Sequence, residues 1–273
     1  MEAVLYVIIA VVILIGLLMY IIAPNRRRDC SKFEGKMFAH RGLHEPGVPE
    51  NSLEAFRRAK EAGYGVELDV QYTSDEKIVV FHDGNLKRMC GIDKNVRDCT
   101  YEELRGYRLE DSDESIPLFT QVLELLDGMP IVCEIKNHNG NVNDKLCKET
   151  YEYLEAYKGE YCIESFSPML VNWFRVHAPQ VIRGQLSCNM AKEQMSPIVK
   201  FMMTHLLVNV MSRPDFIAYR HQDMNMLGYK MCTSLFNPLK VAWTARGVKE
   251  QESAWKKADS VIFELYENDH PVE

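Results

Sequence analysis

The sequence has no excess of positive charge and is poor in glycine and proline. Its 32 Lys and Arg are outnumbered by 39 Asp and Glu, which gives a net charge of −7. A general nucleic-acid-binding domain would carry a basic face instead. The 15 Gly and 11 Pro among 273 residues are too few for a disordered or collagen-like chain. We therefore expect a globular protein that has no nucleic-acid partner.

Paired cysteine motifs are also missing. The eight cysteines form no Cys-x-x-Cys pair and show no other spacing typical of a metal site. A chain of this length buries enough surface to fold without disulfide bonds. We interpret the cysteines as scattered reduced thiols, several of them in the core, which fits a reducing compartment.

One long segment near the amino terminus carries no charge. Residues 3–23 read AVLYVIIAVVILIGLLMYIIA, and a helix of that length crosses a hydrocarbon core of about 30 Å. The alternative is a secretory signal peptide, which would be shorter and would follow basic residues. Only Met1 and Glu2 precede this segment. Residues 1–23 are therefore predicted to be a transmembrane anchor, with the lipid bilayer as a partner.

Basic residues follow the apolar segment directly. Arg26, Arg27 and Arg28 come first, with Lys32 and Lys36 soon after. Because positive residues collect on the cytoplasmic side of a span, we expect a single-pass protein of the cell membrane whose folded domain faces the cytoplasm. A polar linker, residues 24–35, reaches at most about 40 Å. The domain is therefore expected to work close to the bilayer.

Beyond residue 35, short apolar segments alternate with helical patterns. Helices are predicted over 52–62, with Asn51 as the N-cap, and over 144–157. The predicted strands are residues 36–41, 65–70, 130–136, 161–166, 181–186, 216–220, 240–245 and 260–264. Eight strands alternating with helices predict a (β/α)₈ TIM barrel over residues 36–273.

Two segments depart from this alternation. A further strand at 77–83 follows the second strand too closely for a helical crossover, so a hairpin is expected, and residues 84–115 then form a small insertion over the barrel mouth. Residues 198–211 are very apolar and are predicted to be one helix. A thick buried face or a subunit contact explains that composition, and contact with the bilayer is the alternative.

Ionisable residues gather at the predicted strand ends. They are His40, Arg41, Glu67, Asp69, His82, Glu134 and Lys136. Because side chains alternate along a strand, Glu67 and Asp69 share one face of the second strand. Glu134 and Lys136 share one face of the third strand for the same reason. The carboxyl ends of the strands are where barrel enzymes keep their active sites.

These residue types point to a specific chemistry. Three converging carboxylates repel one another unless a cation lies between them, and ligands without His or Cys favour Mg²⁺ or Ca²⁺ over Zn²⁺. Two histidines suit general acid–base work near neutral pH. Arg41 and Lys136 suit the binding of a phosphate. Together the groups indicate metal-assisted attack of water on a phosphodiester.

Residues 40–83, HRGLHEPGVPENSLEAFRRAKEAGYGVELDVQYTSDEKIVVFHD, resemble the signature of the glycerophosphodiester phosphodiesterase family. The shared motifs are HRG, PEN-S/T-x-x-AF, E-x-D-V-x-x-T-x-D and VV-x-HD. Downstream, IPLFTQVL at 116–123 and EIK at 134–136 fit later motifs of that family. The resemblance implies a metal-dependent hydrolase that cuts a glycerophosphodiester into an alcohol and glycerol 3-phosphate.

The resemblance also implies roles for individual residues. These are His40 and His82 as the acid–base pair, Arg41 and Lys136 as phosphate contacts, Glu67, Asp69 and Glu134 as ligands of Mg²⁺ or Ca²⁺, and Trp243 with Phe166 as walls for the glycerol of the substrate. Packing within the barrel is the alternative role for Trp243.

The sequence departs from the family pattern at the rim. Residues 243–246 (WTAR) and 263–266 (FELY) stand where the family has WTVN and TD-x-P. Because these residues line the rim, the motifs do not identify the substrate. One alternative is therefore a phospholipase D-like hydrolysis of lysophospholipids or other membrane phosphodiesters. A second alternative is a non-catalytic protein that binds a phosphorylated ligand or acts as a scaffold.

Overall fold

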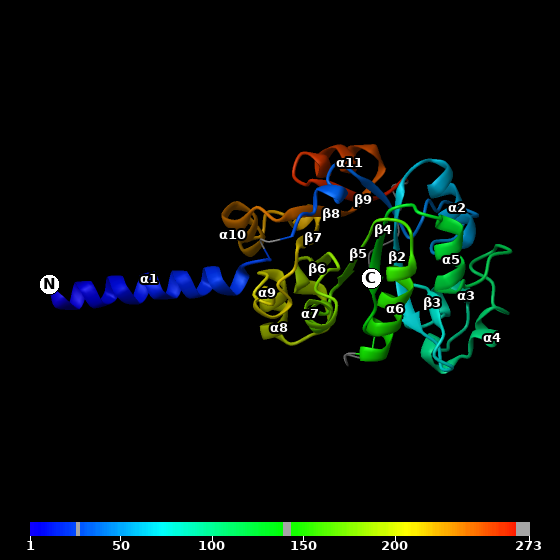
Figure 1. Ribbon diagram of the computed structural model, residues 1–273, viewed down its shortest axis with the longest axis horizontal. Coiled ribbons are helices and arrows are strands. Elements are labelled where there is room, and N and C mark those ends of the chain that lie inside the picture. The colour runs from blue at the N-terminus through cyan, green and yellow to red at the C-terminus, as the bar shows by residue number, and fades with distance from the viewer. Residues whose placement is uncertain (26–27, 139–142, 266–273) are drawn as a thin grey trace.

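The computed structural model describes residues 1–25, 28–138 and 143–265. Eight parallel strands close a barrel in the order β1-β9-β8-β7-β6-β5-β4-β2, and β1 pairs with β2. The strands are β1 Met37–His40, β2 Gly65–Tyr72, β4 Ile131–Ile135, β5 Tyr161–Ser165, β6 Arg183–Ser187, β7 Phe216–Arg220, β8 Leu239–Arg246 and β9 Ser260–Glu264. The predicted TIM barrel is confirmed (Figure 1).

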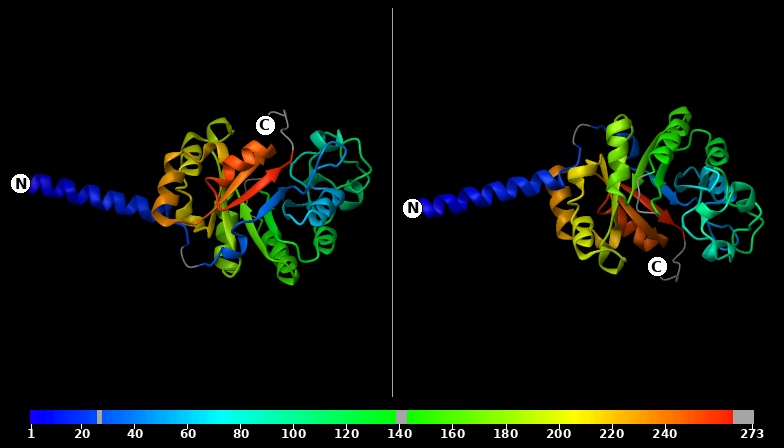
Figure 2. Two further views of the ribbon diagram at one scale, coloured as in Figure 1. Left: turned by 90° about the horizontal axis from the view of Figure 1, so that it is seen from above. Right: turned by 90° about the horizontal axis from the view of Figure 1, so that it is seen from below.

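Helices surround the barrel on its outer side (Figure 2). They are α2 Leu53–Glu61, α5 Phe119–Leu126, α6 Asp144–Ala156, α7 Pro168–His177, α8 Pro197–Thr204, α9 Asn209–Ser212, α10 Leu227–Phe236 and α11 Gly247–Trp255. The main core lies between these helices and the strands, where Phe56, Val66 and Phe174 are fully buried. A second cluster that includes Phe38 and Val132 is also buried, and both residues come from the opposite face of their strands.

The start of α2 differs from the prediction. Ser52, not Asn51, caps the helix, because its side chain accepts a hydrogen bond from the backbone N–H of Ala55. Asn51 instead has a φ of 55°, a left-handed conformation that asparagine tolerates better than most residues. Its side-chain amide donates to Oδ2 of Asp69 at 2.8 Å. The turn before α2 therefore supports the site rather than the helix.

The predicted hairpin is confirmed by β3, Ile78–Val80, which pairs antiparallel with β2. Residues 84–115 follow it and contain the short helices α3 (Lys87–Cys90), η2 (Val96–Asp98) and α4 (Tyr101–Leu104). This segment has its own buried apolar cluster, which includes Met89 and Leu109. It is therefore a small packed unit on the barrel.

The apolar segment 198–211 forms two helices, so the prediction of one helix was wrong. Helix α8 ends at Thr204 and α9 begins at Asn209. Leu206 between them has a φ of 58°, and a left-handed residue cannot continue a right-handed helix. The turn buries the Leu206 side chain completely, and this apolar burial offsets the free-energy cost of ending the helix there.

The amino terminus is a long helix that projects from the barrel (Figure 1). Helix α1, Glu2–Ile22, is long and apolar enough to cross a membrane, as an anchor or a signal sequence would be. Arg26 and Arg27 of the predicted linker lie outside the described residues. Later in that segment, η1 (Ser31–Phe33) buries Phe33, whose ring stacks on Phe38 at 6.2 Å. The carboxyl-terminal part of the linker is thus packed on the barrel.

Candidate active site

Three carboxylates meet on two neighbouring strands of the barrel. Glu67 and Asp69 come from β2 and Glu134 from β4, and the strand register pairs Asp69 with Glu134. One oxygen from each lies within 4.8 Å of the others, and all three residues are buried. The donors are all carboxylate oxygens, which is the ligand type that Mg²⁺ and Ca²⁺ prefer. The residues therefore fit a divalent cation of this kind.

The electrostatics of the cluster show why it suits a cation. Burial and the neighbouring carboxylates raise the pKa of Glu67 well above its usual value. Burial also raises the pKa of Glu134, to about 7, although Lys136 opposes the shift. Asp69 behaves differently, because the cations of Lys136 and Arg41 outweigh its burial and hold its pKa low. Glu67 and Glu134 therefore hold their protons more tightly than an ordinary glutamate, and a bound cation would favour their ionised form.

Lys136 and Arg41 are placed on either side of Asp69. The Nζ atom of Lys136 lies 2.8 Å from Oδ1 of Asp69 and 2.8 Å from Oε2 of Glu134. Arg41 pairs with Glu50 at 2.7 Å and lies 3.4 Å from Asp69, while its backbone N–H donates to Glu67. Both cations are fixed at the mouth by acidic partners, where they can also meet an anionic substrate.

The first predicted histidine, His40, ends β1 beside the cluster. Its Nδ1 atom lies 2.6 Å from Oε1 of Glu264, and its Nε2 atom lies 3.9 Å from Oε2 of Glu67. Burial and the charge of Arg41 lower the pKa of His40, although Glu264 opposes the shift. With Nδ1 hydrogen-bonded to a carboxylate, Nε2 is the nitrogen directed at the cluster.

The second histidine, His82, follows β3. Its Nδ1 atom lies 2.7 Å from Oδ1 of Asp83, and Arg88 binds the same carboxylate. Burial, together with the cations Lys136 and Arg41, lowers the pKa of His82 to about 4. His82 is therefore neutral at pH 7 and can accept a proton.

The two predicted aromatic residues meet on another part of the rim. Phe166 follows β5 and Trp243 lies on β8, and their rings contact edge to face with centroids 5.5 Å apart. The guanidinium of Arg220 lies 5.4 Å from the centroid of Trp243. Among the described residues, Nε1 of Trp243 is buried without a hydrogen-bond partner.

Sequence patterns did not single out three further residues of the site, namely Asn51, Glu164 and Glu264. Glu264 belongs to the segment 263–266, which departs from the family pattern, and this departure is the sequence feature that could have identified it as a site residue. Glu164 pairs in register with Glu134, and its Oε2 atom is buried with no hydrogen-bond partner in the described part of the chain. Burial and Glu134 raise its pKa well above the usual value. It adds a fourth buried acid beside the cluster.

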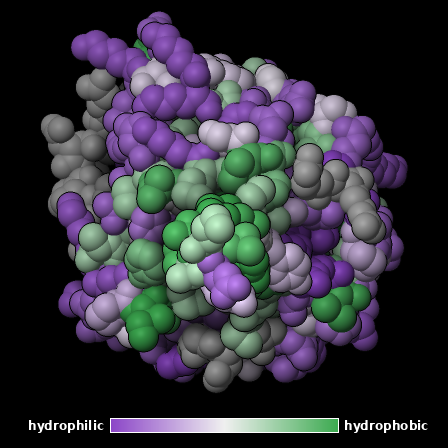
Figure 3. Space-filling view, turned by 90° about the vertical axis from the view of Figure 1, so that its left-hand side faces the viewer, coloured by the Kyte–Doolittle hydropathy of each residue, from purple (hydrophilic) through white to green (hydrophobic). Residues whose placement is uncertain are grey.

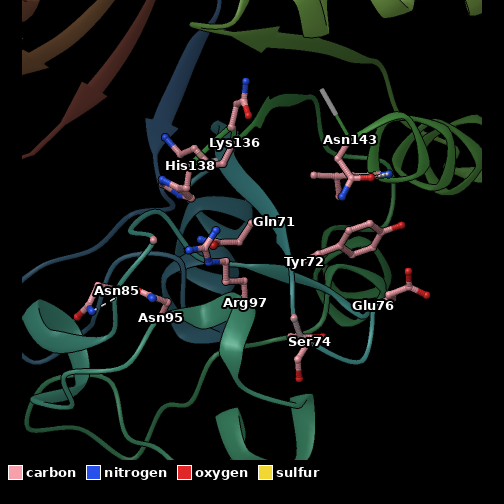
Figure 4. Close-up of a pocket in the computed structure, with 14 residues that line it drawn as sticks. Gln71, Tyr72, Ser74, Glu76, Asn85, Asn95, Arg97, Lys136, His138 and Asn143 are labelled. Atoms are coloured by element: carbon pink, nitrogen blue, oxygen red, sulfur yellow. Dashed lines mark hydrogen bonds between the residues drawn. The ribbon is translucent and has the colours of Figure 1, made fainter. Parts of the chain in front are cut away.

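A cavity of about 600 Å³ opens beside Lys136. Figure 4 shows Lys136 and His138 on one side of this cavity and Asn85, Asn95 and Arg97 of the insertion opposite them. Most lining side chains are polar or charged. The space between the insertion and the barrel can therefore accept a hydrophilic group adjoining the acidic cluster.

The fold and site define a TIM-barrel protein with a buried oxygen-donor cluster and two carboxylate-bound histidines at the mouth. Residues 40–215 match the Glycerophosphoryl diester phosphodiesterase family. The chain belongs to this family, which confirms the resemblance drawn from its motifs.

Individual relatives agree with this membership. Over 148 residues the chain is 36% identical to Lysophospholipase D GDPD1 of Mus musculus, covering 50% of this chain and 46% of that protein. A glycerophosphodiester phosphodiesterase of Caldanaerobacter subterraneus is 33% identical over 162 residues, 55% of this chain and 65% of the relative. The matches to the mammalian relatives span about half of their length.

A solved structure shares the fold. A phosphodiesterase of Oleispira antarctica, in complex with the product sn-glycerol-3-phosphate, superposes with a TM-score of 0.70 at 20% identity. The match covers 86% of this chain and 95% of the other. This likeness establishes the shared barrel architecture.

Proposed function

We propose that this protein hydrolyses glycerophosphodiesters to an alcohol and glycerol 3-phosphate. The observation that carries the proposal is the convergence of the seven predicted residues around Asp69. Asp69 lies within 4.8 Å of the other two carboxylates and contacts both Arg41 and Lys136. His40 approaches the same cluster through Glu67, and the backbone N–H of Phe81, the residue before His82, donates to the carbonyl of Asp69 at 2.9 Å. Membership of the family supports the same reaction.

Glu67, Asp69 and Glu134 would hold Mg²⁺ or Ca²⁺. When bound, such a cation polarises a phosphoryl oxygen and offsets negative charge in the transition state. Lys136 already bridges two of the three carboxylates. It thereby keeps them in place and presents its own charge at the mouth, next to the expected phosphate position.

His40 and His82 would each carry one of the two proton transfers. Both have Nδ1 bound to a carboxylate, Glu264 for the first and Asp83 for the second, so each keeps Nε2 for the reaction. One imidazole, neutral at the start, accepts a proton from the attacking water, and the other, protonated on Nε2 at the start, gives that proton to the leaving alcohol. The fixed carboxylates hold the two rings in orientation and stabilise each imidazolium as it forms.

Arg41 and Lys136 would bind the phosphate, while Phe166 and Trp243 would enclose the glycerol. The edge-to-face contact of the two aromatic rings makes a rigid apolar wall, which suits the carbon face of a small polyol. The polar cavity beside Lys136 lies in a position to receive the hydrophilic part of the leaving alcohol.

A second substrate class has support of its own. The mouse relative is a lysophospholipase D, and α1 is long and apolar enough to anchor the barrel at a membrane. Hydrolysis of lysophospholipids is therefore the alternative within the same chemistry. We also propose that α1 is a single-pass anchor of the cell membrane with the barrel in the cytoplasm. A purely scaffolding role is disfavoured because all seven site residues are present.

The test is to purify the full chain in detergent and to measure glycerol 3-phosphate released from glycerophosphocholine, with and without EDTA. EDTA-sensitive release supports the proposed reaction. In a parallel assay with lysophosphatidylcholine, release of choline would support the alternative. Absence of both products from folded protein supplied with Mg²⁺ or Ca²⁺ would contradict the enzymatic proposal.

A further inference from the structure

The carboxyl-terminal end of α1 is bound by the barrel. A helix normally leaves its last carbonyl groups without partners, but here side chains of the barrel supply them. The amide of Asn209 donates to the carbonyl of Ile22 at 2.9 Å. The guanidinium of Arg213 donates to the carbonyls of Tyr20 and Ala23, both at 2.7 Å. Ile22 itself is only 1% exposed.

Further contacts fix the direction in which α1 leaves. The guanidinium of Arg213 lies 4.4 Å from the centre of the Tyr20 ring, and its positive charge is favourable at the carboxyl end of a helix. Just beyond α1, the backbone N–H of Asn25 donates to the carbonyl of Pro214, and its side chain donates to Asp215. α1 is therefore seated on the barrel rather than tethered by a free segment.

Exposed apolar side chains cluster near this junction. Beyond α1, the described residues include thirteen large exposed apolar side chains, and eight of them fall between residues 195 and 235. Ile198 and Phe201 on α8 are 72% and 58% exposed, and Met211 on α9 and Leu235 on α10 are also exposed. Seen along α1, patches of apolar residues lie near the projecting helix, with polar residues between them (Figure 3). Such clustering is unusual on a surface that meets only water.

The same elements carry few negative charges. Residues 197–236 contain two acids, Asp215 and Asp223, in a chain whose net charge is −7. Asp215 is buried against Arg183, and Asp223 pairs with Arg220. Residues 197–236 therefore present exposed apolar groups without an unpaired acid, which is a composition suited to the headgroup region of a membrane.

We propose that the face formed by α8, α9 and α10 rests on the bilayer that α1 crosses, with Ile198 and Phe201 inserted among the lipids. The reason is geometric: a spanning helix is tilted by about 20° from the bilayer normal on average, so elements beside its fixed end lie at the membrane surface. The proposal rests on α1 being an anchor and is independent of the reaction catalysed.

Fluorescence quenching in membranes tests this placement. The full chain carrying Cys90→Ser and either Ile198→Cys or Phe201→Cys is labelled with an environment-sensitive fluorophore. It is then reconstituted into phosphatidylcholine–phosphatidylserine vesicles that contain lipids brominated near the headgroup. Val248→Cys on α11, where the native side chain is 70% exposed, is the matched control. We expect several-fold stronger quenching at positions 198 and 201 than at position 248.

Each other outcome has a defined meaning. Equal quenching at positions 201 and 248, in protein that floats with the vesicles, would overturn the proposed face while leaving the anchor intact. A shielded but unquenched label at position 201, together with disulfide cross-linking of two Phe201→Cys chains, would assign the face to a second copy and overturn the proposal as well. Failure of the full chain to float would overturn the anchor, and with it this proposal, without bearing on hydrolysis.

Discussion

The Nδ1 atom of His40 lies 2.6 Å from the Oε1 atom of Glu264, so a side-chain hydrogen bond joins the ends of the first and last strands of the barrel at its mouth. Strands β1 and β9 are hydrogen-bonded neighbours, and each residue is the last of its strand. Glu264 is held in turn by Arg246 at 2.7 Å. Closure of the barrel thus supplies the carboxylate that orients His40.

This pairing predicts that Glu264→Ala lowers kcat by roughly 10- to 100-fold, the scale of losing an orienting hydrogen bond. Glu264→Gln should lower it less, because the amide oxygen still accepts from Nδ1. Affinity for the divalent cation should be unchanged, since Glu264 is not among the proposed ligands. Steady-state kinetics and calorimetric titration measure the two effects.

Glu160→Ala is the matched control, because Glu160 precedes β5, pairs with Lys32 at 2.8 Å and has no place in the acidic cluster. Its kcat should stay near that of the parent protein. An equal loss of activity in both variants would show that Glu264 acts through general stability, and no loss in Glu264→Ala would remove its positioning role.

Removal of either proposed acid–base residue should have a larger effect. His40→Ala and His82→Ala should each reduce turnover by roughly 10²–10⁴-fold, which is the usual contribution of a general acid or base. Circular dichroism should show a folded protein in both cases. His177→Ala, on the exposed end of α7, is the control, and near-normal turnover in either site variant would contradict the assignment.

Cation binding should weaken as pH falls. Glu134 has a pKa of about 7, and a carboxylate must lose its proton to ligate a metal. We expect the affinity for Mg²⁺ or Ca²⁺ to rise from pH 6 to pH 8, with protons released on binding. Calorimetry in buffers of different ionisation enthalpy counts those protons, and an affinity independent of pH would contradict the ligand role of Glu134.

The same raised pKa affects stability without a cation. Because the pKa of Glu134 rises from 4.5 to about 7 on folding, its stabilising contribution is complete below about pH 4.5 and is lost as pH rises through 7. Glu134→Gln should therefore flatten the fall in Tm between pH 5 and pH 8 that the parent shows when metal-free.

Glu67→Gln should weaken binding of Mg²⁺ or Ca²⁺ more than it lowers the stability of the fold. Calorimetric titration measures the affinity, and an unchanged affinity in that variant would argue against Glu67 as a ligand.

Thiol accessibility tests the orientation of the barrel. All eight cysteines are free, and seven are buried, whereas Cys90 in the insertion is partly exposed. Cys90 is therefore a better probe than Cys30, which is 9% exposed. A membrane-impermeant maleimide should label Cys90 only after cells are permeabilised, and Cys90→Ser should abolish that signal. Labelling in intact cells would place the barrel outside.

The barrel was predictable because its strands follow local rules. Short apolar strands alternate with amphipathic helices, and the motifs around His40, Glu67 and His82 fall within strands or directly after them. The division of 198–211 was not predictable from periodicity, because apolar residues continue through both helices and the turn between them. Asn51 was misassigned as a cap for a similar reason: Asn and Ser both suit an N-cap, and only the path of the turn decides between them.

The sequence by itself determined the barrel, the apolar amino-terminal helix and the seven ionisable residues of the mouth, because each leaves a pattern within one short segment. Tertiary structure alone decided which further residues contact the seven site residues and the amino-terminal helix. Closing the barrel brings Glu264 of the last strand to His40 of the first. The register of β4 and β5 places Glu164 beside Glu134. The seat of α1 was decided in the same way, by Asn209 and Arg213, which lie almost two hundred residues beyond the carbonyls they bind.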